Sequence, residues 1–292
     1  MIEPVSDLME LSFFPGCSLA TTAKEANQSL VEACRLMGVK LVQVEDWNCC
    51  GSSSAHSLDP ELALGLSARI LSLADPERPL MVMCPSCYKN LRMAQHKLLA
   101  HPAKRRALER RFKRSLDPMP PIVSFLELVR FFKRMDQISH QPAHRPPRDL
   151  SGLKVAPYYG CMLAMPPELQ HHRLLDGLLE DTLTHLGAEV VYFSQRHRCC
   201  GTFLSAARPE VAAELVDGVM GDAVRRGAEC IVTACAMCQL NLEIRCTLDQ
   251  RIPSMHLTEV LALAYGAGDH RKWWPKHLVN PVALLRSHNI IA

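Results

Sequence analysis

The sequence predicts an α/β protein built from two similar halves, each with a mainly parallel β-sheet. Three observations support this prediction. Ten of the thirteen cysteines form one five-cysteine pattern that occurs twice. Short apolar runs alternate with amphipathic stretches of helical length through both copies of the pattern. The apolar runs lack the in-and-out alternation of half-exposed strands, which is typical of strands buried in a parallel sheet.

Each copy of the pattern contains a lone cysteine, an adjacent pair followed by glycine, and a Cys-x-x-Cys. The members are Cys17, Cys49, Cys50, Cys84 and Cys87 in the first copy, and Cys161, Cys199, Cys200, Cys235 and Cys238 in the second. The lone cysteine and the pair are separated by 31 residues in the first copy and 37 in the second, and 33 and 34 residues then lead to the Cys-x-x-Cys. Reactive side chains at matching places predict two similar sites.

The segments between the cysteines repeat in the same order. A strand ending in Gly-Cys is followed by a helix that stops at Gly38 or Gly187, a common helix end. A second strand leads to Cys-Cys-Gly, a second helix follows, and a third strand ends at the Cys-x-x-Cys, which opens another helix. These segments are 11–17, 23–37, 39–44, 60–73 and 80–83, with a closing segment 122–132; their counterparts are 155–161, 173–186, 188–193, 209–226 and 230–233, with 255–265. Because ligand groups of parallel sheets lie at the carboxyl ends of strands, we expect all cysteine groups of one copy at one sheet edge.

The length of 292 residues leaves room for two domains of ordinary size. We expect a first cysteine domain over 1–135, a linker over 136–150 and a second cysteine domain over 151–292. The linker prediction rests on Pro142, Pro146 and Pro147. The segment after Gly268 remains without an assigned role.

The composition excludes several classes of function. A formal net charge of +3 makes no electrostatic case for binding nucleic acid. The basic run 104–114 is interpreted as a solvated helix face, with a docking face for an acidic partner as the alternative. The start of the chain lacks the features of a secretory signal and no stretch is apolar enough for a membrane span, so we expect a cytoplasmic protein. In a reducing cytoplasm, thirteen cysteines favour metal binding or redox chemistry over a disulfide framework.

The number and spacing of the cysteines favour an iron–sulfur cluster in each copy. Five thiolates are one more than a tetrahedral zinc ion accepts, and adjacent side chains diverge, so they reach two metal atoms more easily than one. The glycine after each pair permits a positive φ, and helix N–H groups at each Cys-x-x-Cys can donate to thiolate or sulfide. The spacing differs from that of cubane ferredoxins, and no dinucleotide-binding fingerprint is present. Structural zinc sites and thiol exchange by the Cys-x-x-Cys pairs remain alternatives.

Other residues near the pattern receive less specific interpretations. Three cysteines outside it, Cys34, Cys230 and Cys246, are interpreted as small buried hydrophobic residues. His56 is interpreted as a loop histidine, with a place beside the first site as the alternative. Weaker candidates for such a place are Lys89 and Arg198. Tyr158 and Tyr159 are predicted to be packing residues at a strand end.

The segments around the cysteines resemble the B subunit of heterodisulfide reductase and its bacterial relatives, the family of proteins with CCG cysteine-rich domains. The resemblance covers about 13–266 and is carried by Phe14-Pro15-Gly16-Cys17-Ser18, Trp47-Asn48-Cys49-Cys50-Gly51, Tyr158-Tyr159-Gly160-Cys161 and Cys238-Gln239-Leu240-Asn241-Leu242. It implies two pseudo-symmetric, Rossmann-like halves, each with a noncubane [4Fe-4S] cluster held by the five cysteines of its copy. It also implies a substrate disulfide between the two clusters, each supplying one electron.

The resemblance further implies a complex with two kinds of partner, a ferredoxin-like protein that carries cubane clusters and a flavoprotein. The expected substrate is a disulfide, a thiol or a sulfur-carrier protein, and the bacterial sulfur-oxidation type is our preferred hypothesis. The segment 168–174 departs from the acidic, proline-containing loop of the family beside the second site. The alternative function is a non-catalytic electron-transfer or assembly subunit of another oxidoreductase complex, such as those that oxidise lactate, glycolate or succinate.

Overall fold

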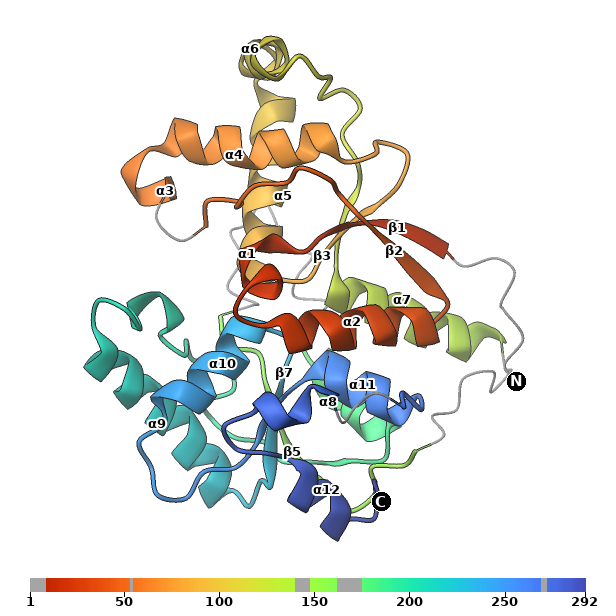
Figure 1. The fold of residues 1–292 in the computed structure, drawn as a ribbon, viewed down its shortest axis with the longest axis vertical. Helices are drawn as coiled ribbons and strands as arrows, with labels where there is room; N and C mark the ends of the chain where they lie inside the picture. Colours follow the sequence, from red (N-terminus) through yellow and green to blue (C-terminus); the bar gives the residue numbers. More distant parts are fainter. Residues whose placement is uncertain (1–8, 53–54, 140–147, 162–174, 269–271) are drawn as a thin grey trace.

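The computed structural model describes residues 9–52, 55–139, 148–161, 175–268 and 272–292. Within them the chain forms two four-stranded sheets in which every pairing is parallel (Figure 1). The strand orders, β2-β1-β3-β4 and β6-β5-β7-β8, are the same topology used twice. The predicted α/β fold of two similar parallel halves is therefore confirmed.

The first half contains the elements that the sequence predicts and two short helices more, α1 (Gly16–Ala20) and α3 (Ala55–Leu58). Its strands are β1 (Met9–Phe14), β2 (Val39–Gln43), β3 (Leu80–Val82) and β4 (Ile122–Ser124); its helices are α1 (Gly16–Ala20), α2 (Lys24–Leu36), α3 (Ala55–Leu58), α4 (Pro60–Leu73), α5 (Pro85–Ala100), α6 (Pro102–Phe112) and α7 (Phe125–Ser139). The start of α4 shows why the helix begins there. Asp59 accepts hydrogen bonds from the N–H groups of Glu61 and Leu62, and Pro60 occupies the first turn, where no N–H is needed.

The second half repeats this order. Its strands are β5 (Lys154–Tyr158), β6 (Glu189–Val190), β7 (Cys230–Thr233) and β8 (Ser254–His256); its helices are α8 (Leu178–His185), α9 (Pro209–Arg225), α10 (Ala236–Arg245), α11 (Leu257–Ala264) and α12 (Val282–Ser287), with the short 3₁₀ helices η2 (Thr202–Leu204) and η4 (Trp274–Lys276). The strand predicted over 188–193 is shorter than expected. Past Val191 the chain leaves the sheet, because the Asp222 carboxylate of α9 accepts the N–H groups of Ser194 and Gln195.

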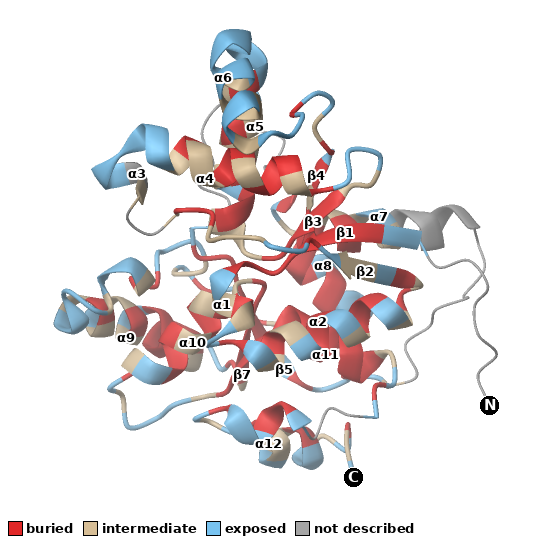
Figure 2. Cartoon of the chain, turned by 45° about the horizontal axis from the view of Figure 1, so that its top comes forward, coloured by how far each residue is buried: buried red, intermediate tan, exposed pale blue. Residues whose placement is uncertain are grey.

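Helix α6 breaks the symmetry between the halves. In the first half α5 and α6 lie between β3 and β4, whereas the second half passes from α10 directly to β8. No residue of α6 is buried, and the helix stands at one end of the molecule (Figure 2). Lys104 pairs with Glu61 and Arg105 with Asp117. The basic run is therefore an exposed helix, as the sequence indicates, and its role as a docking face stays a hypothesis.

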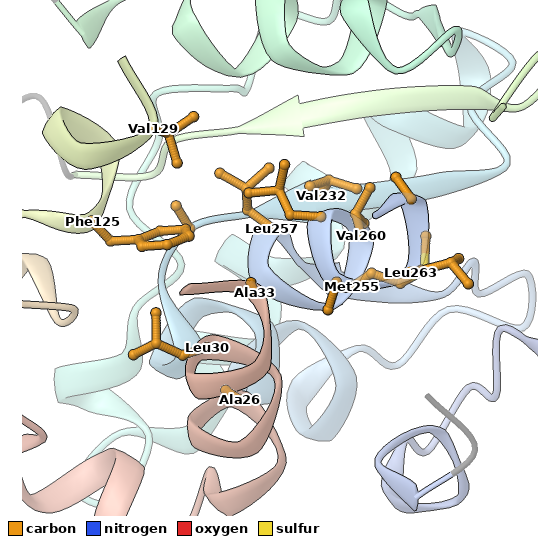
Figure 3. Packing of buried hydrophobic residues seen from close by; sticks show 14 of the residues in the cluster. Ala26, Leu30, Ala33, Phe125, Val129, Val232, Met255, Leu257, Val260 and Leu263 are labelled. Carbon is orange, nitrogen blue, oxygen red and sulfur yellow. The ribbon is translucent and has the colours of Figure 1, made fainter. Parts of the chain in front are cut away.

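The two halves share one hydrophobic core. A single cluster of buried side chains includes residues of β1, α2 and α7 together with residues of β5, α8 and α11. Ala26, Leu30 and Ala33 of α2 lie on one helix face, toward Leu257 and its neighbours in the second half (Figure 3). A buried hydrogen bond of 2.7 Å between the hydroxyl groups of Ser29 and Thr258 crosses the same boundary. The pseudo-symmetric halves thus cannot bury their inner faces separately.

The predicted linker is partly helical. Helix α7 continues to Ser139, so the first residues of the segment 136–150 extend this helix. Residues 140–147 lie outside the described part of the chain, as does the departing segment 168–174. The division of the chain at this segment stays a proposal.

The segment after residue 271, which the sequence left unassigned, packs on the second half. Trp273 and Trp274 are fully buried. His277 lies between two buried carboxylates, with its Nδ1 2.6 Å from Glu243 of α10 and its Nε2 3.0 Å from Glu259 of α11. Burial alone would lower the pKa of His277, but the hydrogen bonds to both glutamates outweigh burial and raise the pKa to about 10.

The raised pKa of His277 predicts that the stability of the fold depends on pH. Because the folded pKa lies above the unfolded value of about 6.5, the stabilisation is complete below that pH and is lost as the pH rises through about 10. We expect the Tm of the wild type to fall more steeply between pH 7 and pH 10 than the Tm of His277→Gln, as measured by circular dichroism. Equal slopes for the two proteins would contradict a charged His277 in the fold.

Candidate metal centre

Every cysteine of the repeated pattern lies at the carboxyl end of a strand. Cys17 is in α1 directly after β1, the Cys49–Cys50 pair follows β2, and Cys84 and Cys87 begin α5 after β3. The second copy follows the same plan after β5, β6 and β7. The sheet edge that the sequence predicted therefore carries all three groups in each half.

In the first half the five sulfurs form one connected set. The Sγ of Cys50 lies 3.1 Å from the Sγ of Cys87, and the Sγ of Cys49 lies 4.0 Å from the Sγ of Cys17. Cys84 hydrogen-bonds to Cys87. Because Cys49 and Cys50 are adjacent in the chain, they link the Cys49–Cys17 contact to the Cys50–Cys87 contact. Cys50 and Cys87 are buried, whereas Cys17 is exposed. The set thus has a buried base and an open side.

The second half gathers its five sulfurs in the same way. The Sγ of Cys200 lies 3.4 Å from the Sγ of Cys238, which also hydrogen-bonds to Cys235. Cys161 hydrogen-bonds to Cys199. Again the base of the set is buried, and Cys161 and Cys199 are exposed. All ten thiols are free of disulfide bonds.

One pair of neighbouring thiols in each half has opposite pKa shifts. The hydrogen bond from Cys87 lowers the pKa of Cys50 to about 6, against the effect of burial, and the same contact raises the pKa of Cys87. In the second half the bond from Cys161 lowers the pKa of Cys199 to about 2, and the pKa of Cys161 is raised. Each pair therefore favours one thiolate stabilised by a neighbouring thiol. Thiolates are the form in which cysteine binds metal.

The glycine after each pair is required by the turn. Gly51 and Gly201 have φ angles of +80° and +76°, which side chains rarely adopt. A Cβ at Gly201 would also come within 2.9 Å of Leu215 and 3.2 Å of the Cα of Ala212. In this conformation the N–H of Gly51 donates to the Sγ of Cys49, and that of Gly201 to the Sγ of Cys199, both over 3.4 Å. The turn thus supplies a donor to one sulfur of each set.

The two sets are neighbours across the boundary between the halves. Helix α1, which carries Cys17, contacts α10, which carries Cys238, and the two helices lie next to each other at the centre of the molecule (Figure 1). The arrangement is therefore a pair of equivalent thiol sets rather than two remote sites.

A model of the family described as "Cysteine-rich domain" (CCG) matches residues 11–92 and 155–243. The chain belongs to the CCG cysteine-rich domain family. Each match spans one complete five-cysteine set. The internal duplication seen in the cysteine spacing is therefore a tandem pair of CCG domains.

Curated relatives of this CCG protein are named as subunits of reductases or as similar to them. It is 30% identical to the "8-methylmenaquinol:fumarate reductase membrane anchor subunit" of Wolinella succinogenes, over 88% of this chain and 92% of that protein. It is 25% identical to a protein of Archaeoglobus profundus named as like the B subunit of heterodisulfide reductase, over 89% and 91% of the two chains. It is 26% identical to the B subunit of the ferredoxin:CoB-CoM heterodisulfide reductase of Methanosarcina mazei, over 87% and 85%. The resemblance to the B subunit of heterodisulfide reductase is confirmed, and the CCG protein is an iron–sulfur redox subunit in class.

A solved structure supports the fold. A hypothetical protein from Helicobacter pylori matches with a TM-score of 0.72 at 12% identity, over 94% of this chain and 52% of that one. This chain thus spans about half of the length of the solved structure. Among the described residues, none of the helices has the length and apolar character needed to cross a membrane.

The donor set of each CCG half fits an iron–sulfur cluster. In the described part of the chain no three His, Cys, Asp or Glu side chains converge as a site for one metal ion. Each half offers five free thiols at one sheet edge, and thiolates are the usual ligands of iron–sulfur clusters. Glycine N–H groups donate to one sulfur of each set. The ten cysteines would hold the clusters, and their roles as ligands stay a prediction.

The structure identifies two functional candidates that the sequence interpretation missed. Asn90 of α5 donates from its Nδ2 to the carbonyl oxygen of Cys50 over 3.3 Å, and Asn241 of α10 donates to that of Cys200 over 2.5 Å. Each asparagine lies three residues after the last cysteine of its set. The extended motif Cys-x-x-Cys-x-x-Asn in both copies was the signal that could have revealed them.

Other sequence interpretations are mostly confirmed. Cys34, Cys230 and Cys246 are buried in the hydrophobic clusters, and burial raises the pKa of Cys34 to about 12. Tyr158 and Tyr159 are fully buried, and Tyr158 also donates to the carbonyl oxygen of Arg198 over 2.6 Å. The side chains of Lys89 and Arg198 are exposed. The side chain of His56 lies outside the described part of the chain.

Proposed function

We propose that the chain is the iron–sulfur subunit of a heterodisulfide reductase-like complex that cleaves or forms a sulfur–sulfur bond, with one noncubane [4Fe-4S] cluster in each half. The observation that carries this proposal is the pair of equivalent five-thiol sets that adjoin across the boundary between the halves. An electron relay needs a chain of centres but no matched pair of sites. Two matched one-electron centres suit a bond whose cleavage requires two electrons.

The residues have distinct parts in this proposal. The ligands are Cys17, Cys49, Cys50, Cys84 and Cys87 for one cluster, and Cys161, Cys199, Cys200, Cys235 and Cys238 for the other. The buried thiols would fix each cluster in the fold, and the exposed Cys17, Cys161 and Cys199 mark the side at which a sulfur substrate would approach. When bound, the clusters would supply the electron transfer, and their N–H donors from Gly51 and Gly201 would stabilise the added charge.

The same comparison supports a complex with further subunits. The named relatives of the heterodisulfide reductase type are B subunits, which implies further subunits in the same enzymes. Electrons would pass through a ferredoxin-like partner with cubane clusters and a flavoprotein partner. The substrate class in this proposal is a disulfide, a thiol or the bound sulfur of a carrier protein.

A second candidate function is electron transfer in a quinol-linked fumarate or succinate complex. Its support is the 30% identity to the fumarate reductase subunit, over 92% of that protein and above the 24–26% shared with the heterodisulfide reductase relatives. The matched, adjoining thiol sets would then accept electrons one at a time for onward transfer.

One experiment separates the two candidates. Anaerobically purified protein is expected to contain about eight iron and eight sulfide per chain, as two [4Fe-4S] clusters require. On mild oxidation, dihydrolipoamide or 2-mercaptoethanesulfonate should produce a new paramagnetic signal, whereas the S-methylated thioether of the same compound should not. A paramagnetic signal that does not change when the thiol is added, together with reduction of the clusters by menaquinol, would favour the second candidate. About one zinc per half with no sulfide would refute both.

A further inference from the structure

One peptide group in each half links a cysteine sulfur to an asparagine side chain. The peptide joins Cys50 to Gly51 in the first half and Cys200 to Gly201 in the second. Its N–H donates to the sulfur of the preceding cysteine, Cys49 or Cys199, over 3.4 Å in both halves. Its C=O accepts from Asn90 over 3.3 Å or from Asn241 over 2.5 Å.

The two ends of this peptide cannot turn independently. A peptide group is planar, so an asparagine that holds the carbonyl oxygen also sets the direction of the N–H on the opposite side. The following residue is glycine, which tolerates φ of either sign, so the turn by itself does not prevent the peptide from flipping. A flip would point the N–H away from the sulfur and the carbonyl oxygen toward it.

We propose that Asn90 and Asn241 are positioning residues that hold the Cys–Gly peptide with its N–H on the cysteine sulfur, and thereby raise the reduction potential of the cluster in their half. This inference rests on the proposed function for the presence of the clusters. Reduction adds negative charge to a cluster and its thiolates, and a hydrogen bond to a thiolate stabilises that charge. Loss of the N–H donor therefore shifts the potential to more negative values.

The two halves depend on their asparagine to different degrees. Asn241 is 5% exposed, and its Oδ1 accepts a short hydrogen bond from the Ser205 hydroxyl, which fixes the amide. In the first half the Cys50 carbonyl oxygen has a second donor, the Ser67 hydroxyl, at 3.2 Å. Asn90 is also less deeply buried than Asn241. The second half should therefore respond to loss of its asparagine more strongly than the first.

The test compares Asn241→Ala and Asn90→Ala in the cluster-loaded protein by redox titration followed with paramagnetic resonance. We expect Asn241→Ala to shift one cluster to a more negative potential and to leave the other unchanged. Asn90→Ala should shift the other cluster less, and the double variant Asn90→Ala with Ser67→Ala should enlarge that shift. Asn241→Leu keeps the approximate size of the side chain and adds no charge but removes the donor, so it should resemble Asn241→Ala even if the alanine variant folds poorly. Asn27→Ala in α2 is the matched control and should change neither potential.

Amide hydrogen exchange in the metal-free protein tests the positioning without any cluster. Loss of one hydrogen-bonded constraint should speed exchange of the Gly201 N–H about tenfold in Asn241→Leu, with no change in Asn27→Ala. Faster exchange with unchanged potentials would overturn the potential-setting role. Unchanged exchange and unchanged potentials would overturn the inference completely. A wild type that binds no iron would refute the proposed function and the potential-setting role, and the exchange rates would still decide whether Asn241 orients the peptide.

Discussion

Replacement of Cys200 by serine is expected to remove about half of the iron and sulfide bound by the protein, because one of its two clusters would be lost. Cys200 is buried, and its sulfur lies 3.4 Å from Cys238 within the connected set of the second half. A serine hydroxyl stays protonated at neutral pH and is a harder donor than thiolate, so it is a poor ligand for an iron–sulfur cluster. Metal and sulfide analysis of anaerobically purified protein measures the loss.

The chain offers a matched partner and a control for this experiment. Cys50→Ser should remove the other half of the iron, because Cys50 has the same place in the first set. Cys34→Ser should leave the iron content unchanged, since Cys34 is equally buried but packs in the hydrophobic core. If either single variant lost both clusters, the halves would not bind metal independently. A fall in iron in Cys34→Ser would mean that this thiol has a role in metal binding.

Replacement of Leu257 by alanine is expected to lower the free energy of unfolding by about 2–5 kcal/mol. Leu257 begins α11, is 0% exposed and lies in the core cluster that both halves share (Figure 3). Because the cavity would open where α2 of the first half packs on α11 of the second, both halves should lose stability together. Urea denaturation followed by tryptophan fluorescence tests this, since Trp47 reports on the first half and Trp273 and Trp274 on the second.

The fluorescence should show a single unfolding transition that moves to lower urea as a whole. When Trp47→Phe is added to Leu257→Ala, Trp273 and Trp274 in the second half are the remaining tryptophan probes. The urea midpoint should then be the same. Leu278→Ala is the control, because Leu278 is 64% exposed and its loss leaves no cavity. Two separate transitions, with only the second one shifted, would show that the halves fold as independent domains.

Local signals were enough to predict most of the elements from the sequence. The helix at 60–73 was predictable because Asp59 and Pro60 mark its start, and the strands at 80–83 and 230–233 because their runs are apolar throughout. The strand over 188–193 was predicted too long. Its end is determined by Asp222, a residue about thirty positions further along the chain, and no local pattern reports such a contact.

Sequence signals were also enough to predict the cysteines of the candidate site, but not its asparagines. The ten cysteines could be found because their spacing repeats and because parallel strands end at one edge. Asn90 and Asn241 were missed, although both lie three residues after a Cys-x-x-Cys, because asparagine on a helix is ordinarily a solvated residue. Only the contact of their amides with the carbonyl oxygens of Cys50 and Cys200 distinguishes them.

The amino-acid sequence by itself determined the duplicated fold and the two sets of five thiols, because strand ends and cysteine spacings are local properties of the chain. The tertiary structure alone decided that the sets adjoin, with α1 on α10, and that the halves share a core, with α2 on α11. The physical reason is that neither half can cover its inner helices with its own residues. Burial of these apolar faces against each other brings the two sites together.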